Sequence, residues 1–381
     1  MFDVLFSIAI SFAITFLAIP VIITVAERKK LFDIPDERKV HRRPIPSLGG
    51  LGIFAGFILA CLIAIPYQIA TDFQFFFAAA FVIFFLGLKD DILVISPIKK
   101  FIGQVLAAFL IIYKGNIQIQ SMHGFLGIHE LPEMFSLLLT YLTVIVIINS
   151  FNLIDGIDGL AGSLGLMAST LFGLYFLQVN MPAFAILAFA LSGSLAAFLI
   201  FNFQPARIFM GDTGSMLIGL VNAILVVKFI SVANQPDIAY PVVASPAIGF
   251  AILVIPLLDT LRVFAIRIFH RRSPFSPDRN HIHHLMLDKG LSHRYIALIL
   301  VSVNLLFIVG AYSGRNIGCT WIILGILMVF FSGIAALYYT RPRTRLFVAR
   351  SIELPVEDEP APELKSKIVP LTTDTILEHK N

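Results

Sequence analysis

Long apolar runs separated by short polar segments dominate this chain. A run of about 20 apolar residues is what an α-helix needs to cross roughly 30 Å of hydrocarbon. Each run here is bounded by charged residues, Pro or Gly. The pattern predicts an all-α integral membrane protein with about eleven transmembrane helices, over residues 4–26, 47–66, 73–88, 99–113, 134–150, 160–178, 182–200, 215–232, 242–266, 295–312 and 319–340.

Two segments depart from this pattern, and the first run needs a separate argument. Between residues 114 and 133, polar and apolar positions alternate up to a Gly-containing turn, which predicts a small exterior β-hairpin. Residues 341–381 are rich in Pro and charge, so we expect a disordered cytosolic tail after one polytopic domain over 1–340. The first run follows Met1 with no basic segment before it, which favours a retained span over a cleaved signal peptide.

The distribution of Lys and Arg predicts the orientation. Nearly all of them fall in loops on one side of the predicted spans, whereas the other side carries only Lys114 and Arg315. Basic loops stay cytosolic, and an odd number of spans puts the termini on opposite sides, so we expect the N-terminus outside and the C-terminus in the cytosol. The net charge of +4 then reflects inner loops and not nucleic-acid binding, and it suits anionic headgroups and phosphorylated ligands.

Composition narrows the class further. Hydrophobic residues make up 58% of the chain and charged residues 14%, against about 45–50% and about 25% in soluble domains. With only Cys61 and Cys319, the chain supports neither a disulfide framework nor a Cys-based metal site.

Carboxylates gather at the predicted cytosolic ends of the spans. They belong to Asp90, Asp91, Asp155, Asp158 and Asp212. A single Asp at such a position is most simply explained as a helix cap, and Asp212, which precedes Thr213 at a predicted helix start, is an example. Five that face one compartment favour a functional site, because ionisable groups near a bilayer are expensive.

The spacing of these acids suggests a hard metal ion. If the loop after residue 154 is already helical, Asp155 and Asp158 share one face, and Gly156, Gly159 and Gly162 form another that admits close approach. Gathered carboxylates repel one another unless a cation or protons neutralise them, and oxygen ligands suit Mg²⁺, with Mn²⁺ as an option. Mg²⁺ in turn shares its shell with substrate phosphates.

A cytosolic loop over residues 273–284 collects cations and imidazoles. It contains Arg279, His281, His283 and His284. Three closely spaced histidines allow a zinc site, but one short loop without Cys rarely closes a tetrahedral shell, so phosphate or sugar recognition is favoured. A solvated polar loop is the plainest alternative.

Two further places carry charge. The inner loop over residues 36–50 supplies Lys39, His41, Arg42 and Arg43 ahead of a Gly pair, a combination that either binds phosphates or only satisfies topology. Asp259 lies within a predicted span, where pairing with Arg262 at i+3 makes its burial tolerable; we interpret it as structural with a possible site role.

Four motifs in family order resemble the polyprenyl-phosphate N-acetylhexosamine-1-phosphate transferases, the superfamily that includes phospho-N-acetylmuramoyl-pentapeptide transferase. The resemblance covers about residues 1–340. It is carried by Asp90-Asp91, by N-L-I-D-G-I-D-G-L-A from Asn152, by M-G-D-T-G-S from Met210 and by S-P-D-R-N-H-I-H-H from Ser276. One departure is that Ile92, Leu93 and Val94 follow the acidic pair, so no third acidic residue stands there.

The resemblance implies ten or eleven helices around a cytosolic cleft with a lipid groove. It implies Mg²⁺ and diphosphate binding by Asn152 and Asp212 together with Asp155, and a base at Asp90 or Asp91. Asp155 and Asp158 count among the catalytic acids. It also implies donor recognition by His281, His283 and His284. The charge of the inner loops adds Lys39, His41 and Arg279 to the predicted substrate-binding residues.

The predicted function is therefore transfer of N-acetylglucosamine 1-phosphate from UDP-GlcNAc to undecaprenyl phosphate, with UMP released, by a Mg²⁺-dependent phosphotransferase. The H-I-H-H motif is similar to that of enzymes using UDP-GlcNAc, while other UDP-N-acetylhexosamines stay open, as do a covalent aspartyl-phosphate route and a homodimer. The motifs suggest a bacterial inner membrane, a site facing the cytosol and a role in cell-envelope polysaccharide synthesis. Rival classes are a cation-coupled transporter, which predicts mid-bilayer acids and discontinuous helices, and a structural scaffold.

Overall fold

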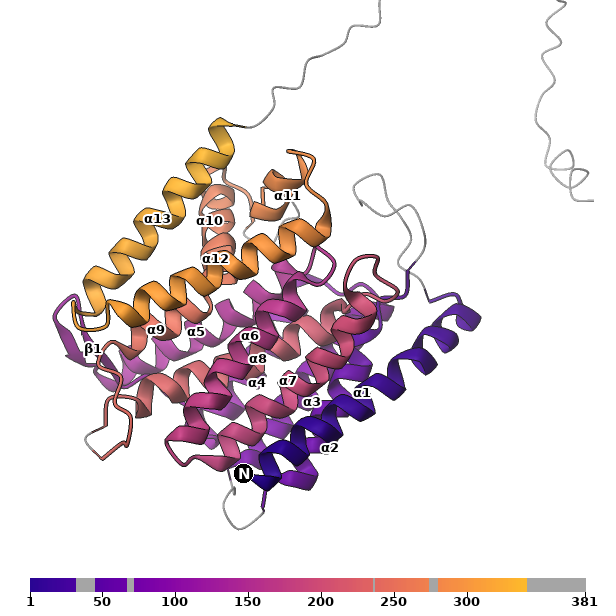
Figure 1. Ribbon diagram of the computed structural model, residues 1–381, viewed down its shortest axis with the longest axis horizontal. Helices are drawn as coiled ribbons and strands as arrows, with labels where there is room; N and C mark the ends of the chain where they lie inside the picture. Colours follow the sequence, from indigo (N-terminus) through magenta and orange to yellow (C-terminus); the bar gives the residue numbers. More distant parts are fainter. Residues whose placement is uncertain (32–44, 67–71, 236, 274–279, 341–381) are drawn as a thin grey trace, which may run out of the picture. The chain divides into compact units, whose positions relative to one another are not determined.

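The computed structural model describes residues 1–31, 45–66, 72–235, 237–273 and 280–340. Every predicted apolar run lies in a helix or a pair of helices (Figure 1). The elements are α1 Phe2–Lys29, α2 Gly49–Ala64, α3 Phe73–Ile92, α4 Pro97–Phe109 followed by a π-helical turn Leu110–Lys114, β1 Ser121–Phe125, β2 Ile128–Glu130, α5 Glu133–Ile154, α6 Leu160–Gln178, α7 Pro182–Asn202, α8 Gly211–Val232, α9 Ser245–Ile252, α10 Val254–Phe269, α11 Ile282–Leu287, α12 His293–Ser313 and α13 Cys319–Tyr339.

Seven of the described helices are long and apolar enough to cross a membrane, or eight if the bent pair α9 and α10 forms one span. The helix α2 is apolar but shorter, with 16 residues. The fold is thus that of a mostly helical, multi-pass membrane protein, as predicted, while the count of about eleven spans and the orientation of the termini stay predictions.

Helix α8 is the central element of this bundle. Of its most apolar stretch 89% is buried, against 22% in α1 and in α13. It packs against α3, α5, α2 and α6, while α1 packs on α2 and α7, and α12 and α13 pack on α9 (Figure 1). The exposed Phe, Leu and Ile side chains of the outer helices then form the surface that faces lipid.

Two glycines bring the start of α8 against its neighbours. A Cβ at Gly50 of α2 would lie 2.2 Å from the backbone nitrogen of Gly214, and a Cβ at Gly87 of α3 would lie 2.5 Å from Cα of Thr213. Only glycine permits such backbone contact. The N-terminal turn of α8 is therefore held directly by the backbones of α2 and α3.

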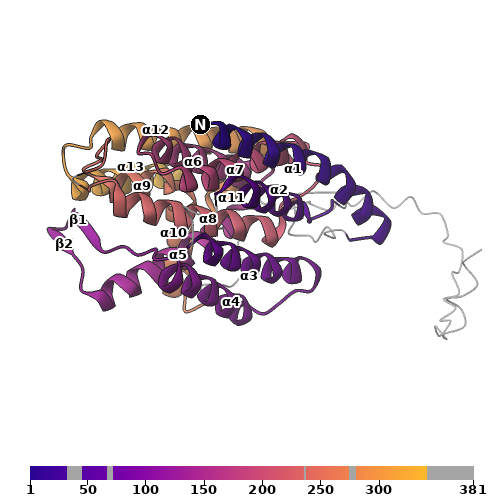
Figure 2. The same ribbon diagram turned by 90° about the horizontal axis from the view of Figure 1, so that it is seen from below.

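The predicted β-hairpin is confirmed. Strands β1 and β2 pair antiparallel, with Ser121 opposite Glu130 and Phe125 opposite Ile128, and they project from one end of the bundle (Figure 2). The predicted tail over 341–381 lies outside the described residues.

The prediction of one continuous helix over 242–266 is wrong, because α9 and α10 meet at an angle of 81°. Pro256 lacks an N–H, and its ring would clash with the carbonyl of Ile252 in a straight helix. The fully buried Asn304 of α12 binds the backbone groups at the break: its Oδ1 accepts from the N–H of Ile255 at 3.1 Å, and its Nδ2 donates to the Ile252 carbonyl at 3.0 Å.

Replacing Asn304 by Leu should lower the free energy of unfolding by about 1–3 kcal/mol, because it leaves buried backbone groups without partners. The measurement is thermal unfolding of the purified protein in detergent. Ser302→Ala, on the exposed side of α12, is the matched control and should not change the midpoint. Equal midpoints for Asn304→Leu and the control would show that Asn304 does not support the break.

Candidate functional site

All the acids of the sequence motifs except Asp158 meet where four helices end or begin. Asp90 and Asp91 occupy the last turn of α3, Asp155 follows α5 directly, and Asp212 is the second residue of α8. Lys100 lies in the first turn of α4, which follows α3 after a short loop. Residues far apart in sequence thereby form one cluster, which we call the acidic cluster: Asp90, Asp91, Lys100, Asn152, Asp155 and Asp212.

Asp212 is the hub of the acidic cluster. Its Oδ2 accepts from Nζ of Lys100 at 2.5 Å, and its Oδ1 accepts from Nδ2 of Asn152 at 2.9 Å. Asn152 also donates to Oγ of Ser215 at 3.1 Å. Helices α4, α5 and α8 are thus joined through one carboxylate. No side-chain cap at the start of α8 comes from Asp212, so its reading as a simple helix cap is wrong.

Asp91 caps α8 from the neighbouring helix. Its Oδ1 accepts from the N–H of Asp212 at 2.7 Å, and its Oδ2 accepts from the N–H and the hydroxyl of Thr213 at 3.0 and 2.5 Å. A carboxylate is well suited to the unpaired N–H groups and positive end of a helix. Both oxygens of Asp91 are therefore engaged in holding α8 in place.

Asp90 faces the cation of the acidic cluster. Its Oδ2 lies 2.5 Å from Nζ of Lys100, and its Oδ1 accepts from the N–H of Ile95 at 2.8 Å. Lys100 consequently bridges the carboxylates of Asp90 and Asp212. Lys100 carried no separate signal in the sequence, because it adjoins Lys99 and the two together resemble an ordinary basic loop.

Asp155 has the least satisfied carboxylate of the acidic cluster. It makes no hydrogen bond to a described residue, and loss of hydration together with the charges of Asp212, Asp91 and Asp158 raises its pKa to about 8. The acidic cluster thus gathers four carboxylates, and the Lys100 ammonium group pairs with two of them, Asp90 and Asp212. A proton or another cation is needed near Asp155 at neutral pH.

The raised pKa of Asp155 predicts a pH-dependent gain of stability on neutralisation. Above its ordinary pKa of about 3.9 the unfolded chain is ionised, while the folded chain keeps its proton up to about pH 8, so wild-type stability falls between these values. Asp155→Asn should therefore raise the melting temperature in metal-free buffer, by an amount that grows from pH 5 to pH 8. Melting curves across that range test this.

Asp158→Asn supplies the control for that experiment. The carboxylate of Asp158 is paired with Nδ1 of His293 at 3.1 Å, so its removal should lower the melting temperature instead. A gain for Asp155→Asn that does not vary with pH would contradict the assigned cause.

The expected helical face shared by Asp155 and Asp158 is wrong. Residues 155–159 form turns, and Gly159 has a positive φ of 77° just before α6 begins. Asp155 consequently joins the acidic cluster, whereas Asp158 is buried against His293 at the start of α12. His293 carried no signal in the sequence, because it stands outside every motif.

Residues His281 to His284, which we call the histidine segment, are attached to the bundle by Asp259. Oδ2 of this fully buried residue lies 2.8 Å from Nδ1 of His281, and its Oδ1 accepts from the N–H of Ile282 and from Arg262, both at 2.9 Å. The predicted pairing of Asp259 with Arg262 is confirmed. Asp259 also contacts His281, which is one of the predicted site residues. Asp259 therefore lies beside the candidate site.

His283 joins the histidine segment to the loop that follows α5. Its ring is parallel to that of His281 at 5.6 Å, and a Cβ on Gly156 would lie 2.8 Å from its Nε2. Burial, with a contribution from His284, lowers the pKa of His283 to about 3, so the imidazole is neutral. Gly156 admits the close approach that the sequence predicted, and a histidine side chain makes it.

Other predicted site residues are less defined. His284 is partly exposed and packs on His283 with ring centroids 4.3 Å apart. Lys39, His41 and Arg279 lie outside the described residues. Within the described ranges no three His, Cys, Asp or Glu side chains form a metal site by themselves, which leaves zinc at the histidines without support.

The acidic cluster nevertheless fits a divalent cation that takes most of its ligands from elsewhere. Asp155 offers oxygens without hydrogen-bond partners among the described residues, and Asp212 lies close enough to raise its pKa. Mg²⁺ is commonly held by one or two carboxylates and completes its shell with water and substrate phosphates. The donor set therefore suits Mg²⁺ better than a metal that needs a full protein cage.

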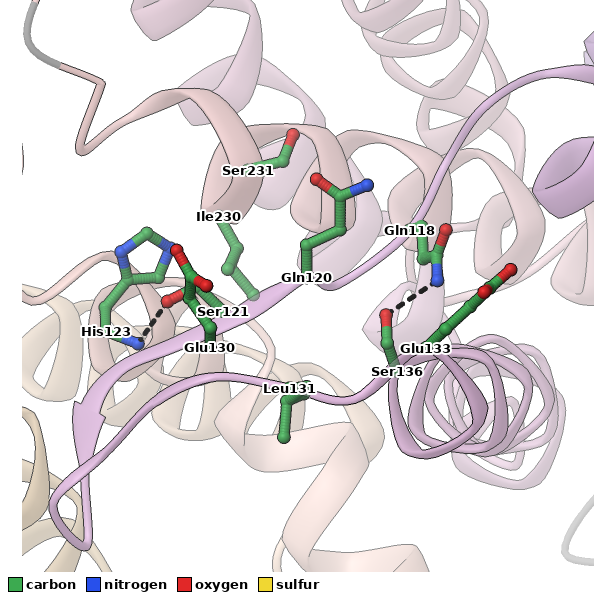
Figure 3. Close-up of a pocket in the computed structure, with 10 residues that line it drawn as sticks. All are labelled: Gln118, Gln120, Ser121, His123, Glu130, Leu131, Glu133, Ser136, Ile230 and Ser231. Atoms are coloured by element: carbon green, nitrogen blue, oxygen red, sulfur yellow. Dashed lines mark hydrogen bonds between the residues drawn. The ribbon is translucent and has the colours of Figure 1, made fainter.

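A pocket lies at the other end of α5 and α8. It has a volume of about 520 Å³, and Figure 3 shows its lining from the hairpin, the start of α5 and the end of α8. Gln118 donates to Ser136 there at 2.7 Å, and the acids present are Glu130 and Glu133. The length of α8 separates this pocket from Asp212 by about 30 Å. Among its described lining residues no Lys or Arg faces these acids, so the acidic cluster is the stronger candidate.

Comparisons with known proteins agree with the geometry. The profile of "Glycosyl transferase family 4" matches residues 73–230, the stretch that contains the whole acidic cluster. A Pasteurella multocida protein is 34% identical over 302 residues, covering 78% of this chain and 82% of its own length. The chain belongs to glycosyl transferase family 4. The predicted resemblance to polyprenyl-phosphate N-acetylhexosamine-1-phosphate transferases is thereby confirmed.

The relatives in this family carry consistent names. The Pasteurella multocida protein, and one from Haemophilus influenzae that is 34% identical over 78% of this chain and 83% of its own, are named undecaprenyl-phosphate alpha-N-acetylglucosaminyl 1-phosphate transferase. One from Mycobacterium leprae, 32% identical over 75% of this chain and 77% of its own, is named decaprenyl-phosphate N-acetylglucosaminephosphotransferase. The histidine segment lies beyond the matched profile, so the acidic cluster is the part that this family defines.

Proposed function

We propose that this chain transfers N-acetylglucosamine 1-phosphate from UDP-GlcNAc to a polyprenyl phosphate, undecaprenyl phosphate in the first place, and releases UMP. The observation that carries the proposal is the acidic cluster, in which four carboxylates, two of them paired with Lys100, lie within the segment shared by the family. The names of the relatives support both the sugar and the lipid class.

In the proposed reaction an oxygen of the lipid phosphate attacks the sugar-side phosphorus of the donor. The bond from that phosphorus to the bridging oxygen breaks, and UMP leaves with the electron pair. Such transfers need little covalent chemistry from the protein and depend on positioning and charge stabilisation. Mg²⁺, held by Asp155 and Asp212, would supply that stabilisation on the diphosphate.

We assign the proton-accepting role to Asp90. Both oxygens of Asp91 are bound by the start of α8, whereas Asp90 pairs through its Oδ2 with the Lys100 side chain and shares a hydrogen bond with the carboxyl group of Asp212. A lipid phosphate that replaces Asp90 as the partner of Lys100 would bring its proton to this carboxylate. Lys100 would then neutralise charge on the reacting phosphates.

Donor recognition is assigned to the histidine segment beside Gly156. His283 approaches Gly156 in the loop that carries Asp155, and His281 stacks on His283, so a nucleotide sugar bound there would have its diphosphate at the acidic cluster. We place this site at the cytosolic face of a bacterial inner membrane, because the donor is soluble and the basic loops lie on this side.

One observation favours the transporter alternative: α9 and α10 form a broken helix pair, and transporters use discontinuous helices. The group at that break is the amide of Asn304, however, and the described acids of the family motifs lie at helix ends. Transfer therefore remains the better supported function.

The test is transfer of radiolabel from UDP-[³H]GlcNAc to undecaprenyl phosphate by the purified full chain in detergent. Labelled lipid should form with Mg²⁺ and not with EDTA. Excess unlabelled UDP-GlcNAc should suppress the label more strongly than UDP-GalNAc does. Label from another UDP-sugar alone would refute the donor, and no label from any donor would refute the function.

A further inference from the structure

A buried amide pair lies next to the acidic cluster and belongs to no motif. Nδ2 of Asn149 in α5 donates to Oε1 of Gln104 in α4 at 2.8 Å, and Nε2 of Gln104 returns a longer contact of 3.4 Å to Oδ1 of Asn149. Gln104 is 2% exposed and Asn149 8%. Gln104 also contacts the Met216 sulfur of α8 at 3.7 Å.

Gln104, Asn149 and Met216 lie on the same faces of α4, α5 and α8 as residues of the acidic cluster. Gln104 follows Lys100 by four residues in α4, Asn149 precedes Asn152 by three in α5, and Met216 follows Asp212 by four in α8. Residues three and four apart lie on one helix face, about one turn or 5 Å along the axis. The contacts of Gln104 with Asn149 and Met216 thus join the same three helices one turn deeper than the contacts of Asp212 with Lys100 and Asn152.

We infer that Gln104 and Asn149 form a positioning pair, which sets the separation and rotation of α4 against α5 so that Lys100 and Asn152 both reach Asp212. Neither residue touches the reacting groups, so both act through the acidic cluster. The inference rests on the proposed function and deepens it.

Physical reasons favour this role over simple packing. In a membrane protein apolar side chains face lipid as readily as one another, so apolar packing alone fixes helix rotation poorly. Nδ2 of Asn149 also donates to the Ile145 carbonyl of its own helix at 2.8 Å, so this donor keeps a partner at any rotation. A different rotation of α4 against α5 would still separate the buried Gln104 amide from the Asn149 side chain, which favours the one rotation that pairs them. The acidic cluster needs such a constraint, since four carboxylates tend to separate.

Removal of both amides provides the test with the least cost in folding. The double variant Gln104→Met/Asn149→Leu replaces each side chain by an apolar one of similar size and leaves no half of the pair unsatisfied. With undecaprenyl phosphate and UDP-GlcNAc, kcat should fall about tenfold or more, because small misplacements of reacting groups are costly. KM for UDP-GlcNAc should change less than about twofold, because the donor is bound by other groups.

Asn222→Leu is the matched control. Asn222 is a fully buried amide of α8 whose Nδ2 binds only the carbonyl of Ile218 in its own helix, at 3.0 Å. Its loss should leave kcat unchanged. Equal loss of kcat in both variants would reduce the pair to general packing and overturn the inference, as would wild-type kcat in the double variant.

Exchange variants keep the inference testable if the double variant does not fold. Gln104→Asn shortens one amide, and Asn149→Gln lengthens its partner. The single variant Gln104→Asn should lose kcat, and the combination Gln104→Asn/Asn149→Gln should recover much of it. Full activity in both single exchanges would overturn the inference.

A readout without turnover separates this inference from the proposed function. Reductive methylation of Lys100, followed by mass spectrometry with Lys99 as internal reference, reports how firmly Asp90 and Asp212 hold the ammonium. Lys100 should react several-fold faster in the double variant than in wild type, whether or not transfer is seen. Unchanged labelling of Lys100 would contradict the positioning role, whereas a wild type inactive with every donor would contradict only the proposed function.

Discussion

Asp212→Asn should reduce transfer of GlcNAc 1-phosphate by about a thousandfold, the scale seen when a preorganised charge at a reacting centre is lost. The carboxylate accepts from Lys100 at 2.5 Å and from Asn152 at 2.9 Å. In Asp212→Asn the new NH₂ group would face either the Lys100 ammonium or the Asn152 amide, both of which are hydrogen-bond donors. The substitution also removes a negative charge that a divalent cation would need. Initial rates with saturating UDP-GlcNAc measure the effect.

The stability of this variant should stay close to that of wild type. The Asp212 side chain is 25% exposed, and α8 keeps its cap from Asp91. Asp237→Asn, an exposed acid far from the acidic cluster, is the control and should retain full activity. Transfer within about tenfold of wild type for a folded Asp212→Asn would remove Asp212 from the machinery.

Lys100→Met should reduce transfer by about a hundredfold. Its ammonium bridges Asp90 and Asp212 at 2.5 Å from each, so its removal leaves these carboxylates to repel one another. The substitution also removes the one cation that the described residues place at the acidic cluster. Lys100→Arg should recover part of the rate, because it restores charge with a different geometry.

Lys99→Met is the matched control for Lys100. The two lysines are adjacent, but Lys99 is exposed and Lys100 points into the acidic cluster. Wild-type transfer by Lys99→Met together with a large loss in Lys100→Met is the expected pair of results. Equal and small losses would indicate that both residues serve only the general charge of the loop.

The helices were predictable because bilayer length and hydropathy fix them with little help from tertiary contacts. The break at Pro256 was not, because Pro20 lies inside α1 without ending that helix. What differs is Asn304 on α12, which offers the freed backbone groups new partners. A contact between residues about fifty positions apart cannot be read from either segment alone.

The site was predictable in its residue types and less so in its assignments. Acids at helix ends identified the acidic cluster, but the turn at Gly159 sends Asp155 and Asp158 to different partners. Lys99 and Lys100 look equivalent in sequence, and only the rotation of α4 separates them. The pairing of Asp259 with Arg262 was predictable because the two residues are three positions apart in one helix. The contact of Asp259 with His281 depends on how α10 and α11 meet.

The most direct test of the central claim follows the phosphorus of the donor. UDP-GlcNAc labelled with ³²P on the sugar-side phosphate is incubated with undecaprenyl phosphate, Mg²⁺ and the purified protein, and the lipid and nucleotide products are separated. Phosphotransfer at the acidic cluster predicts labelled lipid and unlabelled UMP for wild type, and neither for Asp212→Asn. Label retained in UDP while the sugar reaches the lipid would mean that the sugar alone is transferred, and it would contradict phosphotransfer at the acidic cluster.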